Sequence, residues 1–346
     1  MIATLHEGAT GQARTAITLG AGLLLVSLAL LLLGGATGST GIASLRHLMA
    51  ARHDPVAWQI VWDIRLPRTA GAWLAGALLG LAGAVAQGLF RNPLADPYLL
   101  GSASGASLAV AAAMVLFGAS PLATPWLVRL GLTGAAFVGA VAAVLLTLLL
   151  AQGVQHTLRL LLAGVIVGVV LGALTALIML LVPAVQQTLQ VFMFGSTAFV
   201  GWSSCALMAL AWLVCMLVAW MLSHALDGLT LGEATALSLG LPLPAMRAAL
   251  VVVLALATGA AVAQTGLIAF VGLAAPHLVR SVVKTTHGRL ILLSGLMGGV
   301  LLLAADILAR ALIAPQELPV GVLTAVLGGS YLLWLMYRRT DYGQPL

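Results

Sequence analysis

The chain has 346 residues, of which 62% are hydrophobic and 7% are charged, with a mean hydropathy of +1.14 and a formal net charge of +6. Soluble domains carry roughly a quarter charged residues, so this composition excludes a soluble protein and predicts an all-α integral membrane protein. The apolar runs are long and do not alternate with polar residues, which excludes a β-barrel, and the basic residues form no run that would indicate nucleic-acid binding.

Ten apolar runs are expected to cross the membrane, because about 20 helical residues span the hydrocarbon core. In chain order they are 16–33, 67–90, 98–117, 131–151, 160–182, 205–222, 248–267, 268–283, 290–313 and 318–337. The segment Val185–Trp202 is expected to form a short helix at the outer surface. We treat residues 1–346 as one membrane domain, with the first span and an outer loop in 1–60, spans two to five in 61–200 and spans six to ten in 201–346.

The distribution of basic residues predicts the orientation of the chain. An even number of spans places both termini on the same side, and the positive-inside rule assigns the side with more Lys and Arg to the cytoplasm. With the N-terminus inside, the larger, cytoplasmic group is Arg14, Arg91, Arg159, Arg247, Arg280, Lys284, Arg289, Arg338 and Arg339. The smaller, outer group is Arg46, Arg52, Arg65, Arg68, Arg129 and Arg310. This outer group is larger than the rule leads one to expect, which indicates a separate role for some of its members.

The two halves of the chain share a weak sequence repeat. Leu66-Pro67 is followed by the AVAQ sequence at Ala84–Gln87, and Leu243-Pro244 is followed at the same spacing by Ala261–Gln264, an offset of 177 residues. This offset pairs the second span with the seventh, and these two spans cross the membrane in opposite directions. Inverted repeats of this kind are typical of transporters, so we expect two inverted five-helix halves.

Few groups inside the expected spans could carry chemistry. Among the acidic residues only Asp306 falls within a span, and Arg310, four residues later, shares its helix face, so we favour a structural ion pair over a proton relay. Cys205 and Cys215 lie about 15 Å apart along one helix, too far for a disulfide, and are expected to be packing residues. The sequence shows no catalytic cluster and no metal motif. We therefore expect neither enzymatic activity nor a bound metal, and an energy source in a partner protein.

The segment 223–247 is a long polar interruption between spans in the second half. Its periodicity predicts two short helices joined by Gly240 and Pro242, with an apolar side made of leucines and alanines among which Glu233 stands. Such a helix is suited to docking in the groove of a partner protein. The alternative is an interfacial helix on lipid headgroups, but the segment before Arg247 carries no Lys or Arg, so partner docking is favoured.

Several motifs, in a fixed order, carry a resemblance to a known family. They are RLPR at 65–68, NPLADP at 92–97, Leu231-Gly232-Glu233 through Leu239-Gly240, GLIAFVGLAAPHLVR at 266–280 and ELPVGVLTAVLGG at 317–329. The chain resembles the permease subunits of type II ABC importers, the family that takes up vitamin B12, ferric siderophores and haem. The resemblance covers roughly residues 60–340, and the N-terminal 60 residues match only in general character.

The resemblance implies a homodimer of ten-span subunits in the bacterial inner membrane, with both termini in the cytoplasm. Two ATPase subunits, which bind ATP and magnesium, are expected on the cytoplasmic side, and a periplasmic binding protein is expected to deliver the cargo from above. The implied mechanism is alternating access, driven by closure of the ATPase pair. This chain itself is then expected to bind no cofactor and to be a transporter subunit and not an enzyme.

Motif matches also imply roles for individual residues. Rim arginines that pair with glutamates of the binding protein match Arg65, Arg68 and Arg310, for which binding of lipid headgroups is the alternative. The helices that couple the permease to its ATPase match the segment at about 227–246, with the coupling residues Leu231, Gly232, Glu233, Ala236, Leu239 and Gly240.

A gate and a translocation path are implied as well. The turn with Asn92 and Leu94 matches one side of a cytoplasmic gate, and Thr157, at the start of the fifth span, matches the other. The path is expected to be lined by the polar side chain of Gln87 and by small residues of the fifth span that leave room for a bulky cargo, namely Gly164, Gly168 and Gly172.

Haem is the expected cargo, because an apolar, weakly charged path suits a flat porphyrin and neither half shows an extra charged patch for a charged chelate. A ferric siderophore or cobalamin is the alternative within the same family. His156, Met193 and His224 could each ligate haem iron, although lone His and Met side chains in membrane proteins are usually structural. An ion-coupled secondary transporter would fit the inverted repeat, but the spans lack coupling groups, and a membrane enzyme would need a catalytic cluster.

Overall fold

The computed structural model describes residues 2–38, 41–42, 55–117, 126–151 and 157–340. Apart from a two-residue antiparallel ribbon of β1 (Thr37–Gly38) and β2 (Gly41–Ile42), the regular structure in these residues is helical. The helices are α1 (Ile2–Ala36), α3 (Pro55–Ile60), η2 (Val61–Arg65, a π-helix), α4 (Leu66–Phe90), α5 (Ser102–Phe117), α6 (Trp126–Leu150), α7 (Thr157–Leu181), α8 (Pro183–Phe194), α9 (Trp202–Met221), α10 (Ser223–Thr230), α11 (Glu233–Ser238), α12 (Leu243–Thr265), α13 (Val271–Val282), α14 (His287–Ala311) and α15 (Val320–Thr340). The predicted all-α class is confirmed.

The expected spans coincide with helices, but two of those helices are short. In the described part of the chain, seven helices are long and apolar enough to cross a membrane. The spans expected at 98–117 and 268–283 correspond to α5, with 16 residues, and to α13, with 12 residues. Proline accounts for part of this shortening, since Pro93 and Pro97 keep the residues before α5 out of a helix. A count of ten crossings therefore stays a prediction.

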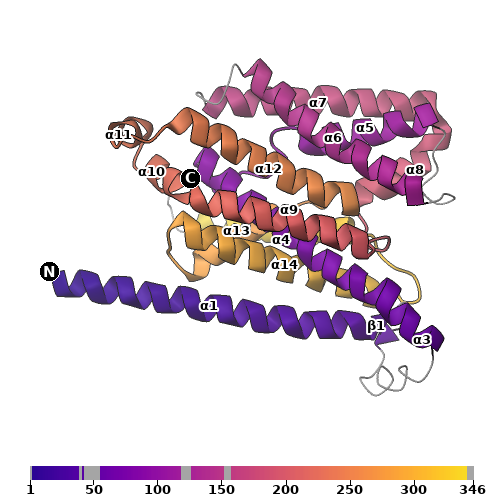
Figure 1. The fold of residues 1–346 in the computed structure, drawn as a ribbon, viewed down its shortest axis with the longest axis horizontal. Coiled ribbons are helices and arrows are strands. Elements are labelled where there is room, and N and C mark those ends of the chain that lie inside the picture. The colour runs from indigo at the N-terminus through magenta and orange to yellow at the C-terminus, as the bar shows by residue number, and fades with distance from the viewer. Residues whose placement is uncertain (1, 39–40, 43–54, 118–125, 152–156, 341–346) are drawn as a thin grey trace.

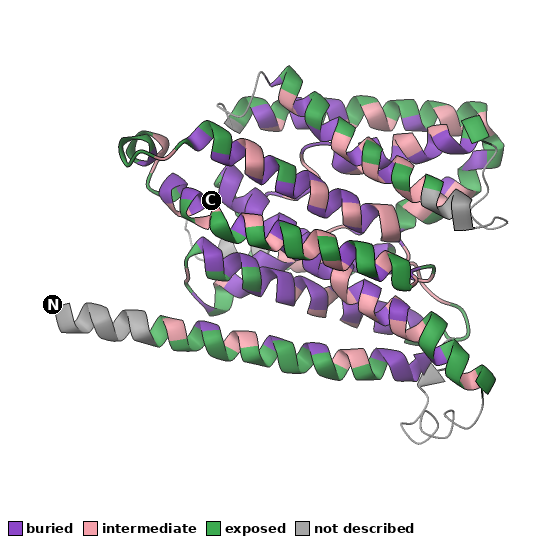
Figure 2. Ribbon diagram, viewed as in Figure 1, coloured by how far each residue is buried: buried purple, intermediate pink, exposed green. Residues whose placement is uncertain are grey.

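Helix α4 forms the centre of the bundle, with α9, α12, α13 and α14 packed around it (Figures 1 and 2). Small residues allow close contact with α14. A Cβ atom added at Gly76 would lie 2.2 Å from the carbonyl oxygen of Gly298, and one added at Gly298 would lie 2.2 Å from the carbonyl oxygen of Gly76. Gly105 and Gly139 repeat this reciprocal approach, at 2.3 Å each way, between α5 and α6. Backbones in contact are the expected way to pack helices in lipid.

The structure agrees with the inverted repeat. Helix α4 runs from α3 toward α10, whereas α12 runs in the opposite direction, from α11 toward α8 (Figure 1). Gln87 and Gln264, the corresponding residues of the two AVAQ sequences, therefore lie at opposite ends of the bundle. We call the end with α10 and α11 the coupling end, and the end with Arg65, Arg68 and Arg310 the arginine end. Helix α1 starts at the coupling end (Figure 1).

Two details of the connecting segments differ from expectation. Helices α10 and α11 meet at Leu231–Gly232, where Gly232 has φ +100°, a conformation that glycine adopts more readily than other residues. Gly240 and Pro242 instead separate α11 from α12. The short surface helix expected over Val185–Trp202 is α8, which ends at Phe194 and is followed by a non-helical segment before α9.

Candidate functional site

A network of charged side chains is buried at the arginine end. Asp306 of α14 is fully buried and accepts hydrogen bonds from Arg310 at 2.6 Å, from Arg68 at 3.2 Å and from the hydroxyl of Thr197 at 2.5 Å. Arg68 of α4 also donates to the carboxylate of Glu317 at 2.8 Å. The network therefore joins α4 and α14 to the loops before α9 and before α15. The structural ion pair expected between Asp306 and Arg310 is confirmed.

Arg310 lies deeper than the sequence indicated. Arg310 is 1% exposed. In addition to its bond with Asp306, its guanidinium donates hydrogen bonds to the carbonyl oxygens of Gly34 and Thr37, each at 3.1 Å. These bonds attach the end of α1 to α14. The structure thus corrects the location of this side chain: Arg310 is at the expected end of the bundle but is enclosed within the chain and is not on the rim. Its role in docking stays a prediction.

Arg65 differs from the other two arginines in its surroundings. It ends the π-helix η2 and is half-buried, and its carbonyl oxygen accepts a hydrogen bond from the Thr69 hydroxyl at 2.7 Å. Arg68 is turned toward the network, with 11% of its side chain exposed. In the described part of the chain, carboxylates hold Arg68 and Arg310 in ion pairs, whereas no such ion pair is found for Arg65.

Tryptophans that the sequence analysis did not single out lie beside Arg65. The indole N–H of Trp202 donates to the carbonyl oxygen of Trp62 at 2.9 Å, and the ring centroids of these residues are 5.5 Å apart. Trp58 stacks on Trp62 with centroids 6.3 Å apart. All three are exposed, as is typical of aromatic residues at a membrane–water boundary. They indicate where the membrane surface lies at the arginine end.

The proposed gate turn lies at the coupling end, after α4. The side-chain oxygen of Asn92 accepts a hydrogen bond from the backbone N–H of Leu94 at 2.9 Å, which forms a local turn, and both residues are exposed. Asp96 in the same turn accepts from the backbone N–H of Tyr98 at 2.8 Å, and burial raises the pKa of its carboxyl. Thr157 is the first residue of α7, and its side chain lies outside the described residues. The gate assignment stays a prediction.

The coupling segment, α10 with α11 and the residues that flank α11, presents apolar side chains at its surface. Leu231 and Leu239 are each 63% exposed, whereas Ala236 is buried against the segment itself. Glu233 forms an ion pair with Arg247 at the start of α12, with a distance of 2.8 Å. Its carboxylate is therefore held in place by the chain and still partly exposed.

An interaction that the sequence analysis missed fixes α10 to α14. The carboxylate of Asp227 lies 2.7 Å from Nδ1 of His287 and accepts a hydrogen bond from the backbone N–H of the same residue at 3.0 Å. His287 begins α14, so this contact links α10 directly to the helix that carries Asp306 at its other end. No local sequence pattern joins residues 60 positions apart.

The residues expected along the path have different surroundings. Gln87 is 2% exposed, donates to the carbonyl oxygen of Leu273 at 3.2 Å and accepts a hydrogen bond from Arg280. Its side chain thus lies between α4 and α13 and is not on an open surface of this single chain. A Cβ at Gly164 would lie 2.2 Å from the carbonyl oxygen of Leu99, so Gly164 is a packing position.

The other two path glycines are less crowded. A Cβ at Gly168 would meet its nearest neighbouring atom at 3.8 Å, and one at Gly172 would have no neighbour within 4 Å. These two positions of α7 are consistent with a wall that leaves room for cargo. The path assignment of Gln87, Gly164, Gly168 and Gly172 stays a prediction.

The candidate iron ligands do not lie together. Met193 is exposed on α8 at the arginine end, and His224 is exposed on α10 at the coupling end (Figure 1). His156 lies outside the described residues. Within the described chain no group of three or more His, Cys, Asp or Glu side chains could hold a metal ion. The two cysteines are free and buried, as expected for packing residues: Cys205 contacts the carbonyl of Pro67, and Cys215 that of Val253.

Comparison with known proteins identifies the relatives of the chain. The haemin transport system permease protein HmuU of Yersinia pestis is 36% identical over 323 residues, covering 92% of this chain and 96% of that protein. The vitamin B12 import system permease protein BtuC of Salmonella paratyphi A is 42% identical over 284 residues, covering 80% and 83%. An inward-facing structure of a metal-chelate type ABC transporter superposes with a TM-score of 0.82 at 28% identity, covering 93% of this chain and 99% of that one.

The match extends over nearly the whole chain. The family model described as the FecCD transport family matches residues 23–338, a range that includes the arginine network, the gate turn and the coupling segment. The apolar helices of the structure and the sequence relatives agree on a membrane permease. The chain therefore belongs to the FecCD transport family and is a multi-pass membrane permease.

Proposed function

We propose that this chain is the membrane-spanning subunit of an ATP-driven importer of the bacterial inner membrane, in which two copies form the permease. The observation that carries the proposal is the coupling segment. Leu231 and Leu239 expose apolar side chains beside the carboxylate of Glu233, which an ion pair with Arg247 holds in place. They lie at one end of the protein, outside the helices that are long enough to span a membrane. A short helical segment with exposed leucines suits the groove of a partner protein. We assign that groove to a cytoplasmic ATPase, which would hold ATP and magnesium.

In this proposal the arginine end faces the periplasm and receives a substrate-binding protein, and both chain termini are cytoplasmic. Arg65 would pair with a carboxylate of the binding protein, while Arg68 and Arg310 hold the docking surface in shape through Asp306. Movement of α10 on ATP binding would act on α14 through the pair of Asp227 and His287. The gate turn at Asn92 and Leu94 would then open or close against the start of α7, which gives alternating access.

We propose haem as the cargo. The support is the similarity to HmuU, named as a haemin permease, which covers 92% of this chain, together with the apolar character of α7. Cobalamin is the second candidate, because identity to BtuC is higher, at 42%, over a shorter match. A ferric siderophore is the third candidate cargo. Each of these cargoes is bulky, and a wall of small and apolar residues would pass it along without binding it tightly.

The test is reconstitution of the chain with its ATPase in liposomes, followed by addition of the cognate binding protein loaded with haem, cobalamin or a ferric siderophore. We expect haem to stimulate ATP hydrolysis and to accumulate inside the liposomes, with the other two cargoes inactive. Stimulation by cobalamin or siderophore alone would support the assignment as an importer but identify a different cargo. Uptake that proceeds without ATPase or ATP would overturn the importer and favour a secondary transporter.

A further inference from the structure

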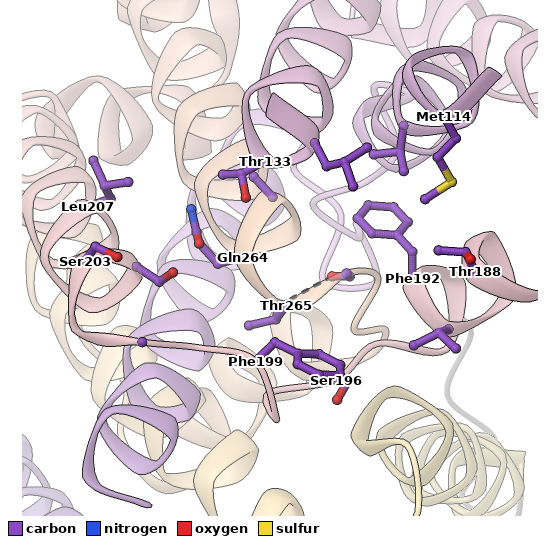
Figure 3. Close-up of a pocket in the computed structure, with 17 residues that line it drawn as sticks. Met114, Thr133, Thr188, Phe192, Ser196, Phe199, Ser203, Leu207, Gln264 and Thr265 are labelled. Atoms are coloured by element: carbon purple, nitrogen blue, oxygen red, sulfur yellow. Dashed lines mark hydrogen bonds between the residues drawn. The ribbon is translucent and has the colours of Figure 1, made fainter. Parts of the chain in front are cut away.

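A cavity of about 470 Å³ at the arginine end is separate from the gate turn and the coupling segment. It lies between the ends of α5, α8 and α12 and the first turns of α6 and α9 (Figure 3). The lining residues used below are Val110, Thr133, Ser203, Leu207 and Gln264. Its volume is within the range of small-molecule sites.

The cavity extends into the depth of the membrane. Val110 is seven residues from the end of α5 and Leu207 is five residues from the start of α9, so the cavity reaches roughly two helical turns, about 10 Å, below the helix ends. Leu207 is itself half exposed, which shows that the cavity opens along α9. The neighbouring outward side chains of α9, Leu210 and Leu213, are also exposed and apolar. Exposed leucines along α9 are the kind of surface that contacts lipid hydrocarbon, which is consistent with access to the cavity from the bilayer.

The lining chemistry narrows the class of ligand. None of the residues that line the cavity carries a charge; they are aliphatic and aromatic side chains with several hydroxyl groups and one amide. Ser203 lies at the membrane-surface end of the cavity, one residue after Trp202, whereas Val110 and Leu207 lie at the deep end. An occupant with a neutral, hydrogen-bonding group near the surface and a hydrocarbon chain below it fits this gradient.

Gln264 provides a second, independent observation. Its repeat counterpart, Gln87, has its amide satisfied by Leu273 and Arg280. The Gln264 amide instead points into the cavity, and none of the other lining residues forms a hydrogen bond with it (Figure 3). Gln264 is partly exposed in the cavity, so an occupant with a hydrogen-bond acceptor could pair with its amide.

We propose that this cavity binds one acyl chain of a membrane glycerolipid together with its ester carbonyl. The ester oxygen accepts a hydrogen bond from the Gln264 amide, with the hydroxyls of Thr133 and Ser203 nearby, and the chain lies against Val110 and Leu207. Because the lining is uncharged, the headgroup is not recognised, and affinity depends on the acyl ester part alone. The surrounding bilayer is the source of this ligand.

The experiment is native mass spectrometry of the delipidated full chain titrated with three probes that share the same acyl chains: dioleoyl phosphatidylethanolamine, dioleoyl phosphatidylglycerol and dioleoylglycerol. We expect one tightly held molecule of each probe, with dissociation constants that agree within a factor of about three. Leu207→Trp fills the cavity and should weaken binding about tenfold or more. Leu210→Trp, one turn further along α9 and outside the cavity, is the matched control and should bind as the wild type does.

A second variant tests the same site in case Leu207→Trp misfolds. Gln264→Leu keeps the side-chain volume and removes the amide, and should weaken all three probes equally while the thermal unfolding temperature changes little. Equal binding by wild type and Leu207→Trp would overturn the proposal. So would a strong preference for one headgroup, or the absence of any tightly held lipid on the wild-type chain.

Discussion

Gly76 on α4 and Gly298 on α14 approach each other so closely that a Cβ atom on either would lie 2.2 Å from the carbonyl oxygen of the other. The two helices therefore meet backbone against backbone at the middle of the bundle. This contact lets α14 lie against α4 along its length and brings Arg68, Asp306 and Arg310 together at one end. The charged network depends on this glycine contact.

Gly298→Ala should destabilise the chain, because even one methyl group would force α4 and α14 apart. We expect a loss of about 1–3 kcal/mol, the usual cost of overpacking a close-packed core. Thermal unfolding in detergent measures it. Gly22→Ala on α1 is the control: no atom lies within 4 Å of the added methyl group, so this variant should be neutral or slightly more stable. Equal destabilisation by both would contradict the glycine contact.

Asp306→Asn should be strongly destabilising, because it leaves the buried guanidinium of Arg310 without its carboxylate. Removing one partner of a buried ion pair typically costs about 3–5 kcal/mol. The same unfolding assay applies, and Asp63→Asn, an exposed carboxylate at the same end, should change little. A small effect of Asp306→Asn would mean that the remaining hydrogen bonds of Arg310 suffice.

Arg65→Glu should weaken docking of the substrate-binding protein without loss of stability. Reversal of one charge at the edge of an interface is expected to raise the dissociation constant about tenfold, mainly through slower association at low salt. Arg68→Glu should instead lower the unfolding temperature, because it places a carboxylate beside Asp306 and Glu317. Surface plasmon resonance with the immobilised permease measures the dissociation constant for the substrate-binding protein. Unchanged docking by Arg65→Glu would exclude Arg65 as a contact.

Glu233→Lys should abolish co-purification of the ATPase, and it also breaks the ion pair with Arg247. The double variant Glu233→Lys with Arg247→Glu separates these effects, since it restores an ion pair of reversed polarity. We expect the double variant to recover the unfolding temperature and still fail to bind the ATPase. Recovery of ATPase binding in the double variant would show that Glu233 acts only through Arg247.

The raised pKa of Asp96 predicts that the stability of the folded chain depends on pH. Burial raises the pKa of its carboxyl above the usual 3.8. The buried, protonated carboxyl therefore contributes its full stability below about pH 3.8, and this contribution is lost as the pH rises through the pKa of the folded state. Asp96→Asn retains an acceptor for the backbone N–H of Tyr98 and removes the charge. The variant should therefore be more stable than the wild type at neutral pH, and the difference should vanish near about pH 4. Unfolding temperatures across this range measure it, and a pH-independent difference would contradict the assignment.

Much of the helix pattern follows from the sequence because span length and proline position are local signals. The expected span at 67–90 and α4 (Leu66–Phe90) agree within one residue, since Pro67 suits the first turn of a helix and the apolar run sets the length. Helix α12 (Leu243–Thr265) also begins at a Leu-Pro pair, but it starts five residues before the expected span at 248–267. The pairing of Asp306 with Arg310 was also local, because both lie on one face of one helix.

The direction of the remaining polar side chains could not be predicted, because it depends on partners far away in the sequence. Arg310 was expected on the rim, but carbonyl groups at the end of α1 enclose it. Gln87 has its hydrogen-bond partners on α13, Leu273 and Arg280, and no local pattern connects these residues to it. Periodicity identifies a helix face and not the element that will cover it. The contact between Asp227 and His287 was missed for the same reason.

Helix α7 has a consequence for how the subunit can move. Only a narrow stripe of it is packed, including Leu160, Gly164 and Val167, whereas apolar side chains elsewhere on it are widely exposed, such as Val169 at 67% and Leu180 at 76%. A helix of 25 residues satisfies its own backbone in lipid and needs few tertiary contacts to persist. Tilting or rotating α7 therefore breaks few interactions, while α4 is held on all sides. The subunit thus places loosely packed helices, of which α7 is one, around a tightly packed centre.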